Sequence, residues 1–380
     1  MAGGAVRDLL LGRPVRDIDL VVVGDGTRFA RLLAAELGVP ARVHERFSTA
    51  TLDTEGRSID VATARRESYD RPGALPRVEP SARIEVDLFR RDFTINAMAL
   101  EIGPGRRLRL HDPFGGRADL AKKQIRILHP RSFEDDPTRA LRAVRYATRL
   151  QFSIDPKTRQ ALREAVRGRY VDSVSGERLR RELALLLSEP HRENSVRSLD
   201  RLGIARAIDP SLRVRTQTAG RLREAERTTL RLKMNPDWIA YLLSWVGALK
   251  PDAARALADR LRLSGRERRP LLSWPSTLAS LRSLPQLSPS SVAKLDLSAE
   301  ELLASLTVLP GPARRDILRA IRQSPVELEI AGRDLVKAGL APGPEVGRAL
   351  ARTLAARRDG MISRQEELEF ALRSSEKPTL

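Results

Sequence analysis

The chain has 380 residues, of which 41% are hydrophobic and 4% aromatic, so helical cores built on Leu and Ala are more expected than an aromatic-rich β-sandwich. Lys and Arg outnumber Asp and Glu by 68 to 49, giving a net charge of +19, which favours a polyanionic partner such as nucleic acid, although arginine-biased codon usage would raise the charge too. The absence of cysteine excludes disulfides, thiolate zinc sites and cysteine nucleophiles.

No apolar run approaches the roughly 20 residues of a membrane span, the longest lying near residues 240–249. The first four residues show neither the basic nor the apolar region of a signal peptide. We therefore expect a cytoplasmic protein without a membrane partner.

The chain divides into two parts with different sequence patterns. Up to about residue 130, short β-rich runs alternate with turns and predict strands at 18–23, 48–52, 58–62 and 107–111. From residue 137 onward the pattern is helical, with no convincing strand. Pro/Ser-rich breaks at 273–276 and 285–291 predict joints between helical subdomains. The whole therefore indicates an α+β head followed by a helical body.

A glycine pair, Gly3 and Gly4, precedes a short predicted helix at 6–11 that Gly12 stops. Glycines at this place let a phosphate approach the backbone at the positive end of a helix. A simple turn produces the same pattern, and the segment is not a P-loop because GxxxxGK[ST] is absent.

Asp17 and Asp19 stand two residues apart in a predicted strand, so both side chains point to one face. Paired carboxylates suit Mg²⁺ that carries nucleotide phosphates, although a solvated strand end has the same pattern. Asp60 lies between apolar neighbours in another strand-like run. If the two strands are adjacent, three carboxylates converge, which is the minimum for two-metal phosphoryl transfer.

Together, these features resemble those of the class II tRNA nucleotidyltransferase and bacterial poly(A) polymerase family. The matching segments follow the family's order over nearly the whole chain: residues 3–8 with Asp17, Asp19 and Asp60 (motif A and the third carboxylate), 90–99 (motif B), 112–120 (motif C), 135–145 (motif D) and 330–347 (tail).

The resemblance implies a polymerase-β-like nucleotidyltransferase head with a small mixed sheet, followed by an all-α neck, body and tail. The expected boundaries are 1–130 for the head, 131–200 for the neck, 201–275 for the body and 276–380 for the tail. It also implies transfer of CMP and AMP from CTP and ATP to the 3′ end of tRNA, without a nucleic-acid template.

The resemblance also assigns roles by position. Asp17 and Asp19 would bind Mg²⁺, and Asp60 would help activate the primer hydroxyl. The expected nucleotide-binding residues are Gly3, Gly4 and Arg7 for the triphosphate, Arg91, Asp92 and Asn96 for the sugar, and Asp136, Arg139, Arg142 and Arg145 for the base and phosphates.

Motif D has a chemical rationale of its own. Cytosine and adenine both present an amino donor beside a ring-nitrogen acceptor, which a carboxylate and a guanidinium can match; uracil and guanine reverse this pattern. Asp136 and Arg139 have the i, i+3 spacing for such a pair. The alternative is that Asp136 caps a helix with Pro137 at its first position, while the arginines of 139–149 form a solvated face.

Other segments leave their roles open. Motif B could be a surface charge cluster, motif C is expected to be a structural or hinge-like turn, and the four histidines lack metal-ligand spacing. Residues 65–76 resemble the family's flexible loop, but do not decide between CCA, CC and A addition. Family members carry a helix and a strand before the glycine pair that Met1 and Ala2 do not supply, so we expect an exposed sheet edge.

Two rivals remain on sequence grounds: a poly(A) polymerase, and a catalytically inactive RNA-binding protein on the same fold. For a tRNA nucleotidyltransferase and a poly(A) polymerase alike, we expect the Arg-rich helical body to bind RNA phosphates, with an affinity that depends strongly on salt concentration.

Overall fold

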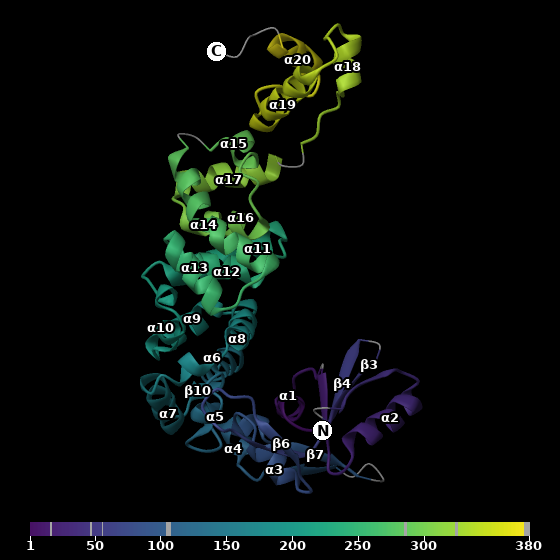
Figure 1. Ribbon diagram of the computed structural model, residues 1–380, viewed down its shortest axis with the longest axis vertical. Coiled ribbons are helices and arrows are strands. Elements are labelled where there is room, and N and C mark those ends of the chain that lie inside the picture. Colours follow the sequence, from purple (N-terminus) through teal and green to yellow (C-terminus); the bar gives the residue numbers. More distant parts are fainter. Residues whose placement is uncertain are drawn as a thin grey trace. The chain divides into compact units, whose positions relative to one another are not determined.

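The computed structural model describes residues 1–15, 17–45, 48–54, 56–103, 108–284, 287–323 and 326–375, with residue 57 described by its backbone alone. The chain forms two compact units, Met1–Arg213 and Val214–Leu380 (Figure 1).

A four-stranded sheet in the order β1-β4-β3-β2 forms the centre of the head. Strand β1 (Asp17–Val22) pairs in parallel with β4 (Arg57–Thr63). The other two strands, β3 (Thr49–Thr54) and β2 (Ala41–His44), are antiparallel to their neighbours. The predicted strands 18–23, 48–52 and 58–62 are therefore confirmed, each with its ends shifted by one or two residues.

Helix α2 (Gly26–Leu37) covers one face of this sheet (Figure 1). It begins at Asp25, whose carboxylate accepts a 2.9 Å hydrogen bond from the backbone N–H of Arg28, and ends at Gly38. Its small residues pack on the apolar side chains of the strands, namely Ala30 and Ala34 against Ala50, Leu52 and Val61 with Leu20, Val22 and Ile59 around them. Because strand side chains alternate, Asp19 and Asp60 face away from α2.

Helix α1 (Gly4–Leu10) precedes the sheet and starts two residues earlier than predicted. The backbone N–H of Ala2 donates to the carbonyl of Asp19 at 2.8 Å, and Ala2 also bridges to Ala99. The chain before α1 therefore contacts β1, which nevertheless forms the edge of the four-stranded sheet, as expected.

Two hairpins complete the β-structure of the head. They are β5 (Arg65–Ser68) with β6 (Arg77–Pro80), and β7 (Ala99–Ile102) with β8 (Leu108–His111). The expected strand 107–111 is confirmed from residue 108; residue 107 lies outside the described residues. A short helix, α3 (Ile84–Phe89), lies between the hairpins.

The rest of the first unit is helical with one exception. Strand β10 (Ser153–Ile154) pairs in parallel with β9 (Gln124–Ile125), so the prediction of no strand after residue 137 is wrong at this place. Two residues give too short a pattern to be recognised in sequence. The helices are α4 (Gly116–Ala121), α5 (Ser132–Asp135), α6 (Arg139–Leu150), α7 (Pro156–Arg167), α8 (Gly176–Ser188), α9 (Arg192–Arg201) and α10 (Ile204–Ile208).

The second unit contains helices throughout its described residues. They are α11 (Thr218–Leu232), α12 (Trp238–Val246), α13 (Pro251–Arg260), α14 (Gly265–Ser283), α15 (Pro289–Ala293), α16 (Ala299–Val308), α17 (Gly311–Gln323), α18 (Gly332–Lys337), α19 (Pro344–Asp359) and α20 (Glu367–Ser375). The long apolar run near residue 240 is α12, all of whose nine residues are buried. Within the described ranges, no helix is both long and apolar enough to cross a membrane.

The expected break at 273–276 is wrong, because α14 runs through it and contains Pro270 and Pro275. A buried stripe of Leu271, Trp274 and Leu278 continues on both sides of Pro275, and the indole N–H of Trp274 donates to the carbonyl of Gly247 at 2.7 Å. This packing outweighs the cost of proline inside the helix. The second expected break falls between α14 and α15, with residues 285–286 outside the described part.

Candidate functional site

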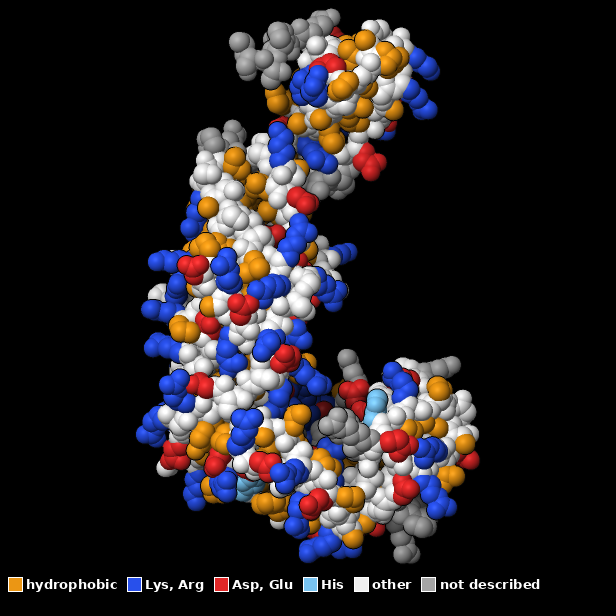
Figure 2. Space-filling view, viewed as in Figure 1, with side chains coloured by type: hydrophobic (Ala, Val, Ile, Leu, Met, Phe, Trp, Pro, Cys, Tyr) orange, Lys and Arg blue, Asp and Glu red, His pale blue; other side chains and the backbone are white. Residues whose placement is uncertain are grey.

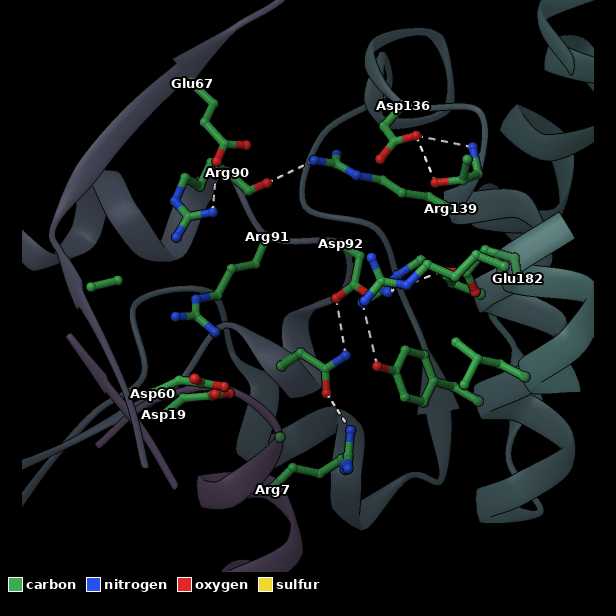
Figure 3. A pocket seen from close by; sticks show the side chains of 18 of the residues that line it. Arg7, Asp19, Asp60, Glu67, Arg90, Arg91, Asp92, Asp136, Arg139 and Glu182 are labelled. Atoms are coloured by element: carbon green, nitrogen blue, oxygen red, sulfur yellow. Dashed lines mark hydrogen bonds and ion pairs between the residues drawn. The ribbon is translucent and has the colours of Figure 1, made fainter. Parts of the chain in front are cut away.

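Two carboxylates meet on the uncovered face of the sheet. Asp19 of β1 lies directly opposite Asp60 of β4 in the parallel ladder, and neighbouring strands are about 4.8 Å apart. Their side chains lie next to each other in Figure 3. Asp17 projects to the same face two residues earlier, at the exposed start of β1.

The surroundings of Asp19 disfavour its charged form in the absence of a cation. Burial raises the pKa of Asp19, and the negative charges of Asp60 and Asp17 raise it further, against the opposing effect of Arg91. The hydroxyl of Thr51 donates to Asp60 Oδ1 at 2.6 Å. Oxygen ligands on one face with mutual repulsion fit a hard divalent ion. Among the described residues, however, no three potential ligands stand close enough to form a ready metal centre.

The glycine pair is shaped by its neighbours. Gly3 has φ +76°, and its backbone N–H donates to the carbonyl of Met98 at 3.0 Å. A Cβ at Gly3 would stand only 2.4 Å from Nη1 of Arg91, so a side chain at position 3 would require the guanidinium of Arg91 to shift. The guanidinium of Arg91 contacts Asp87 at 3.2 Å and points toward Asp19 and Asp60 (Figure 3).

A chain of polar side chains links α1 to α6. Arg7, 2% exposed, donates to both carboxylate oxygens of Asp8 at 2.8 and 2.7 Å and to Oδ1 of Asn96 at 2.6 Å. The amide nitrogen of Asn96 donates to Asp92 Oδ1 at 2.9 Å, and Arg142 donates to Asp92 Oδ2 through two nitrogens at 2.9 and 2.7 Å. The two arginines therefore hold a fixed relation through two buried polar residues.

These contacts determine the charge states of the linked side chains. Burial opposes ionisation of Asp92, but Arg142, Asn96 and Arg139 together lower the pKa of its carboxyl. The charge of Asp92 is the largest cause that raises the pKa of Arg142. Burial lowers the pKa of Arg7, but Asp8 outweighs it and the net direction is upward. The pair of Asp92 and Arg142 is thus an ion pair with both members charged.

Most of these residues line one cavity of about 630 Å³ (Figure 3). Ten of the thirteen site residues expected from the sequence line it: Gly4, Arg7, Asp19, Asp60, Arg91, Asp92, Asn96, Asp136, Arg139 and Arg142. The other three, Gly3, Asp17 and Arg145, are not part of its lining.

Comparisons with known proteins agree with this geometry. Profiles described as "Poly A polymerase head domain" and "Probable RNA and SrmB- binding site of polymerase A" match residues 1–126 and 151–214. A CC-adding tRNA nucleotidyltransferase of Deinococcus radiodurans is 34% identical over 98% of this chain and 88% of its own length. The chain belongs to the tRNA nucleotidyltransferase family. The resemblance inferred from the motifs is thereby confirmed.

Further relatives in the family differ in length and in the nucleotides their names assign. An A-adding tRNA nucleotidyltransferase of Geobacter sulfurreducens is 32% identical over 98% of this chain, which spans only 44% of that relative. The structure described as Thermotoga maritima CCA-adding enzyme complexed with tRNA is 31% identical, with a TM-score of 0.79 over 99% of this chain and 90% of that one. The expected α+β head with helical parts is confirmed by this likeness.

Motif D of the family lies at the far side of the cavity, and its contacts differ from those expected. Asp136 Oδ1 accepts from the N–H of Thr138 at 3.0 Å, from its hydroxyl at 2.7 Å and from Arg178 at 2.6 Å. Arg139 donates instead to the Ser132 hydroxyl at 2.7 Å and the Arg90 carbonyl at 2.7 Å. The i, i+3 spacing therefore produces no direct pair between Asp136 and Arg139.

The alternative reading of motif D is supported in its first part and wrong in its second. Helix α6 is assigned from Arg139, but Thr138 already has helical backbone angles and its side chain caps no backbone N–H. Asp136 has extended backbone and accepts from the N–H of Thr138, as an N-cap residue with Pro137 at the first helical position does. The arginines of α6 are not a solvated face, because Arg139 and Arg145 are 5% and 6% exposed. The acids Asp92, Glu182 and Glu189 contact Arg142 and Arg145 and offset their charges.

A tyrosine that the sequence analysis missed lies among these arginines. Four guanidinium carbons lie within cation–π distance of the Tyr146 ring centre: Arg145 at 4.9 Å, Arg7 at 5.3 Å, Arg149 at 5.5 Å and Arg142 at 5.6 Å. Phe93 meets the ring edge-on at 5.9 Å. Tyr146 directly follows motif D on the same helix, four residues after Arg142, and this spacing was a usable signal.

Of the expectations for the other motifs, the one for motif C is confirmed and one alternative for motif B is wrong. In motif C, Asp112 accepts from the backbone N–H groups of Gly116 and Arg117 at 2.6 and 2.9 Å, which confirms its structural role at the start of α4. The surface-cluster alternative for motif B is wrong, since Asp92 and Asn96 are buried. Glu67 and Tyr69, from the segment that resembles the family's flexible loop, also line the cavity. Cavity-lining residues of α8 to which the sequence analysis gave no role are Arg178, Arg181, Glu182 and Leu185.

Proposed function

We propose that this chain adds CMP, AMP or both, from CTP and ATP, to the 3′ end of tRNA without a nucleic-acid template. The observation that carries the proposal is the register of Asp19 opposite Asp60 at one side of a cavity that Asp136 lines at the other. The names of the relatives, which include A-adding, CC-adding and CCA-adding enzymes, support the substrate class.

The proposed metal is Mg²⁺, held by Asp17 and Asp19. When bound, it would supply neutralisation of the triphosphate and a lower pKa for the primer hydroxyl. Asp60 has its Oδ1 occupied by Thr51, which leaves Oδ2 to accept the proton of that hydroxyl. The primer oxygen then bonds to the α-phosphorus, and pyrophosphate leaves.

The triphosphate is proposed to lie against Gly3, Gly4 and Arg7. The two N–H groups of Arg7 on Asp8 and the third on Asn96 fix the guanidinium before any ligand arrives. Such preorganisation lowers the cost of holding the leaving group in line. In the present arrangement Asp92 and Asn96 orient Arg7 and Arg142, so their proposed contribution to the sugar site runs through these arginines.

Base selection is proposed to depend on Asp136 and Arg139. Three donors occupy Asp136 Oδ1, and within the described part of the chain no donor is bonded to Oδ2. That oxygen can accept the amino hydrogen of cytosine or adenine, while an N–H of Arg139 that is not engaged with Ser132 or Arg90 can donate to the ring nitrogen. Uracil and guanine would leave both groups unpaired, at a cost of about 1–3 kcal/mol each.

RNA is proposed to bind through phosphate contacts of the helical parts. Lys and Arg side chains are spread over the visible face of both units, with Asp and Glu side chains among them (Figure 2). The division into head, neck, body and tail at residues 130, 200 and 275 is kept as a proposal, as is a cytoplasmic location.

The test uses tRNA transcripts that end before CCA, after CC and after CCA, each offered CTP, ATP or both. Addition of one to three nucleotides followed by a stop supports the proposal and reads out whether CCA, CC or A is added. Long A tails would identify a poly(A) polymerase instead. Equal, negligible incorporation by the wild type and by Asp19→Ala would identify an RNA-binding protein without catalysis.

A further inference from the structure

Helix α8 forms one wall of the cavity with residues to which neither the motifs nor the comparisons give a role. Arg178, Arg181, Glu182 and Leu185 all line it, at the i, i+3, i+4, i+7 spacing of one helix face. Two of them are committed to protein contacts, Arg178 to Asp136 at 2.6 Å and Glu182 to the arginines of α6 at 3.5 Å. Arg181 and Leu185 are left facing the cavity.

Arg181 differs from the other arginines of the cavity because none of the described residues forms a hydrogen bond or ion pair with its side chain. Each of the others contacts an acceptor: Arg7 with Asp8, Arg90 and Arg91 with Asp87, Arg139 with Ser132, Arg142 with Asp92, and Arg178 with Asp136. Arg181 is exposed and makes no hydrogen bond or ion pair within the part of the chain that the structure describes. A guanidinium held open on a cavity wall suits a phosphate.

Leu185 is an apolar side chain on this otherwise polar wall. It is 42% exposed, although most leucines of α8 are fully buried. Four residues after Arg181, it lies on the same helix face, with the two Cβ atoms about 5–6 Å apart. One nucleotide can therefore place its phosphate on Arg181 and the face of its base on Leu185.

We propose that Arg181 and Leu185 bind the 3′-terminal nucleotide of the RNA primer. This proposal rests on the proposed function. The incoming nucleotide already has Arg7 for its triphosphate and Asp136 for its base, whereas the contact proposed above for the primer, Asp60, concerns its 3′ hydroxyl and leaves its base and phosphate without an assigned residue. An apolar contact imposes no hydrogen-bond pattern, which suits a subsite that must accept each successive 3′ end whatever its base.

The test is steady-state transfer by Arg181→Gln and by Leu185→Asn, with RNA and nucleotide varied separately. Each variant should raise the KM for RNA about tenfold, leaving kcat and the KM for the nucleotide within about twofold. Arg181→Gln should also lower the slope of log affinity against log salt for RNA binding by about one. Leu185→Met, which keeps the apolar contact, should restore the wild-type KM.

The matched control is Arg28→Gln on α2 of the head, an exposed arginine outside both the cavity and the helical parts proposed to bind RNA, which should leave every parameter unchanged. A raised KM for the nucleotide with an unchanged KM for RNA overturns the proposal, because α8 would then serve the incoming nucleotide. Unchanged values for both substrates overturn it as well. If the wild type transfers nothing, the proposed function fails, and direct binding of the RNA still tests the subsite: equal affinity of wild type and Arg181→Gln then overturns it.

Discussion

Asn96 joins Arg7 to Asp92, accepting a 2.6 Å hydrogen bond from Nη1 of Arg7 and donating a 2.9 Å bond to Oδ1 of Asp92. Both polar atoms of its amide are thus engaged within the protein. One buried side chain therefore fixes the arginine proposed to bind the triphosphate relative to the carboxylate that holds Arg142.

The first prediction is that Asn96→Ala raises the KM for the nucleotide. The substitution removes one of the three hydrogen bonds that restrain Arg7 and one of the donors to Asp92. Because hydrogen bonds to charged groups contribute about 1.5–3 kcal/mol, we expect the KM for the nucleotide to rise about tenfold or more. Steady-state kinetics with a fixed RNA concentration would measure it. An unchanged KM for the nucleotide would show that Arg7 needs no support from Asn96.

The second prediction concerns Asp19 and the pH dependence of stability. Burial and the charges of Asp60 and Asp17 raise its pKa, so the folded state binds its proton more tightly than the unfolded chain does. The associated stability is present below the ordinary carboxyl pKa and is lost as the pH rises through the raised value. Asp19→Asn should therefore raise the Tm at pH 7 without divalent ions, although it abolishes transfer.

The same pair tests the metal site. Added MgCl₂ should raise the Tm of the wild type, because a bound ion relieves the repulsion between the carboxylates, and should leave the Tm of Asp19→Asn nearly unchanged. Equal shifts in both proteins would place the effect of the ion elsewhere.

The third prediction is that Gly3→Ala lowers both stability and transfer. Position 3 has φ +76°, and the new Cβ would stand 2.4 Å from Arg91 Nη1, so Arg91 must move away from Asp19. The backbone strain alone costs about 1 kcal/mol. Gly12→Ala is the control, since Gly12 has φ +64° with no atom within 4 Å of an added Cβ. Chemical denaturation and kcat/KM should show the larger loss for Gly3→Ala; equal losses would exclude the clash with Arg91.

How far the sequence could predict this site depends on whether its contacts are local. Alternation of polar and apolar residues placed Asp19 and Asp60 on one face correctly, because a strand enforces a period of two. The same reasoning failed for Asp136, whose partner Arg178 is 42 residues away, on a different helix. Spacing along α6 could indicate that Arg139 lies near Asp136, but not that Ser132 and Arg90 already accept its hydrogen bonds.

The last prediction is that the Tyr146 ring, rather than its hydroxyl, positions the arginines. Arg7 and Arg142 lie 5.3 and 5.6 Å from the ring centre, whereas the hydroxyl accepts only a long 3.4 Å hydrogen bond from Arg142. Tyr146→Phe should therefore keep the KM for the nucleotide within about twofold of the wild type. Tyr146→Leu keeps an apolar side chain against Phe93 but removes the π face, and should raise that KM by roughly fivefold to thirtyfold for about 1–2 kcal/mol of lost cation–π attraction. Thermal unfolding of both variants separates loss of fold from loss of positioning. A wild-type KM for Tyr146→Leu would assign the role to packing, whereas a KM for Tyr146→Phe as high as that of Tyr146→Leu would assign it to the hydroxyl.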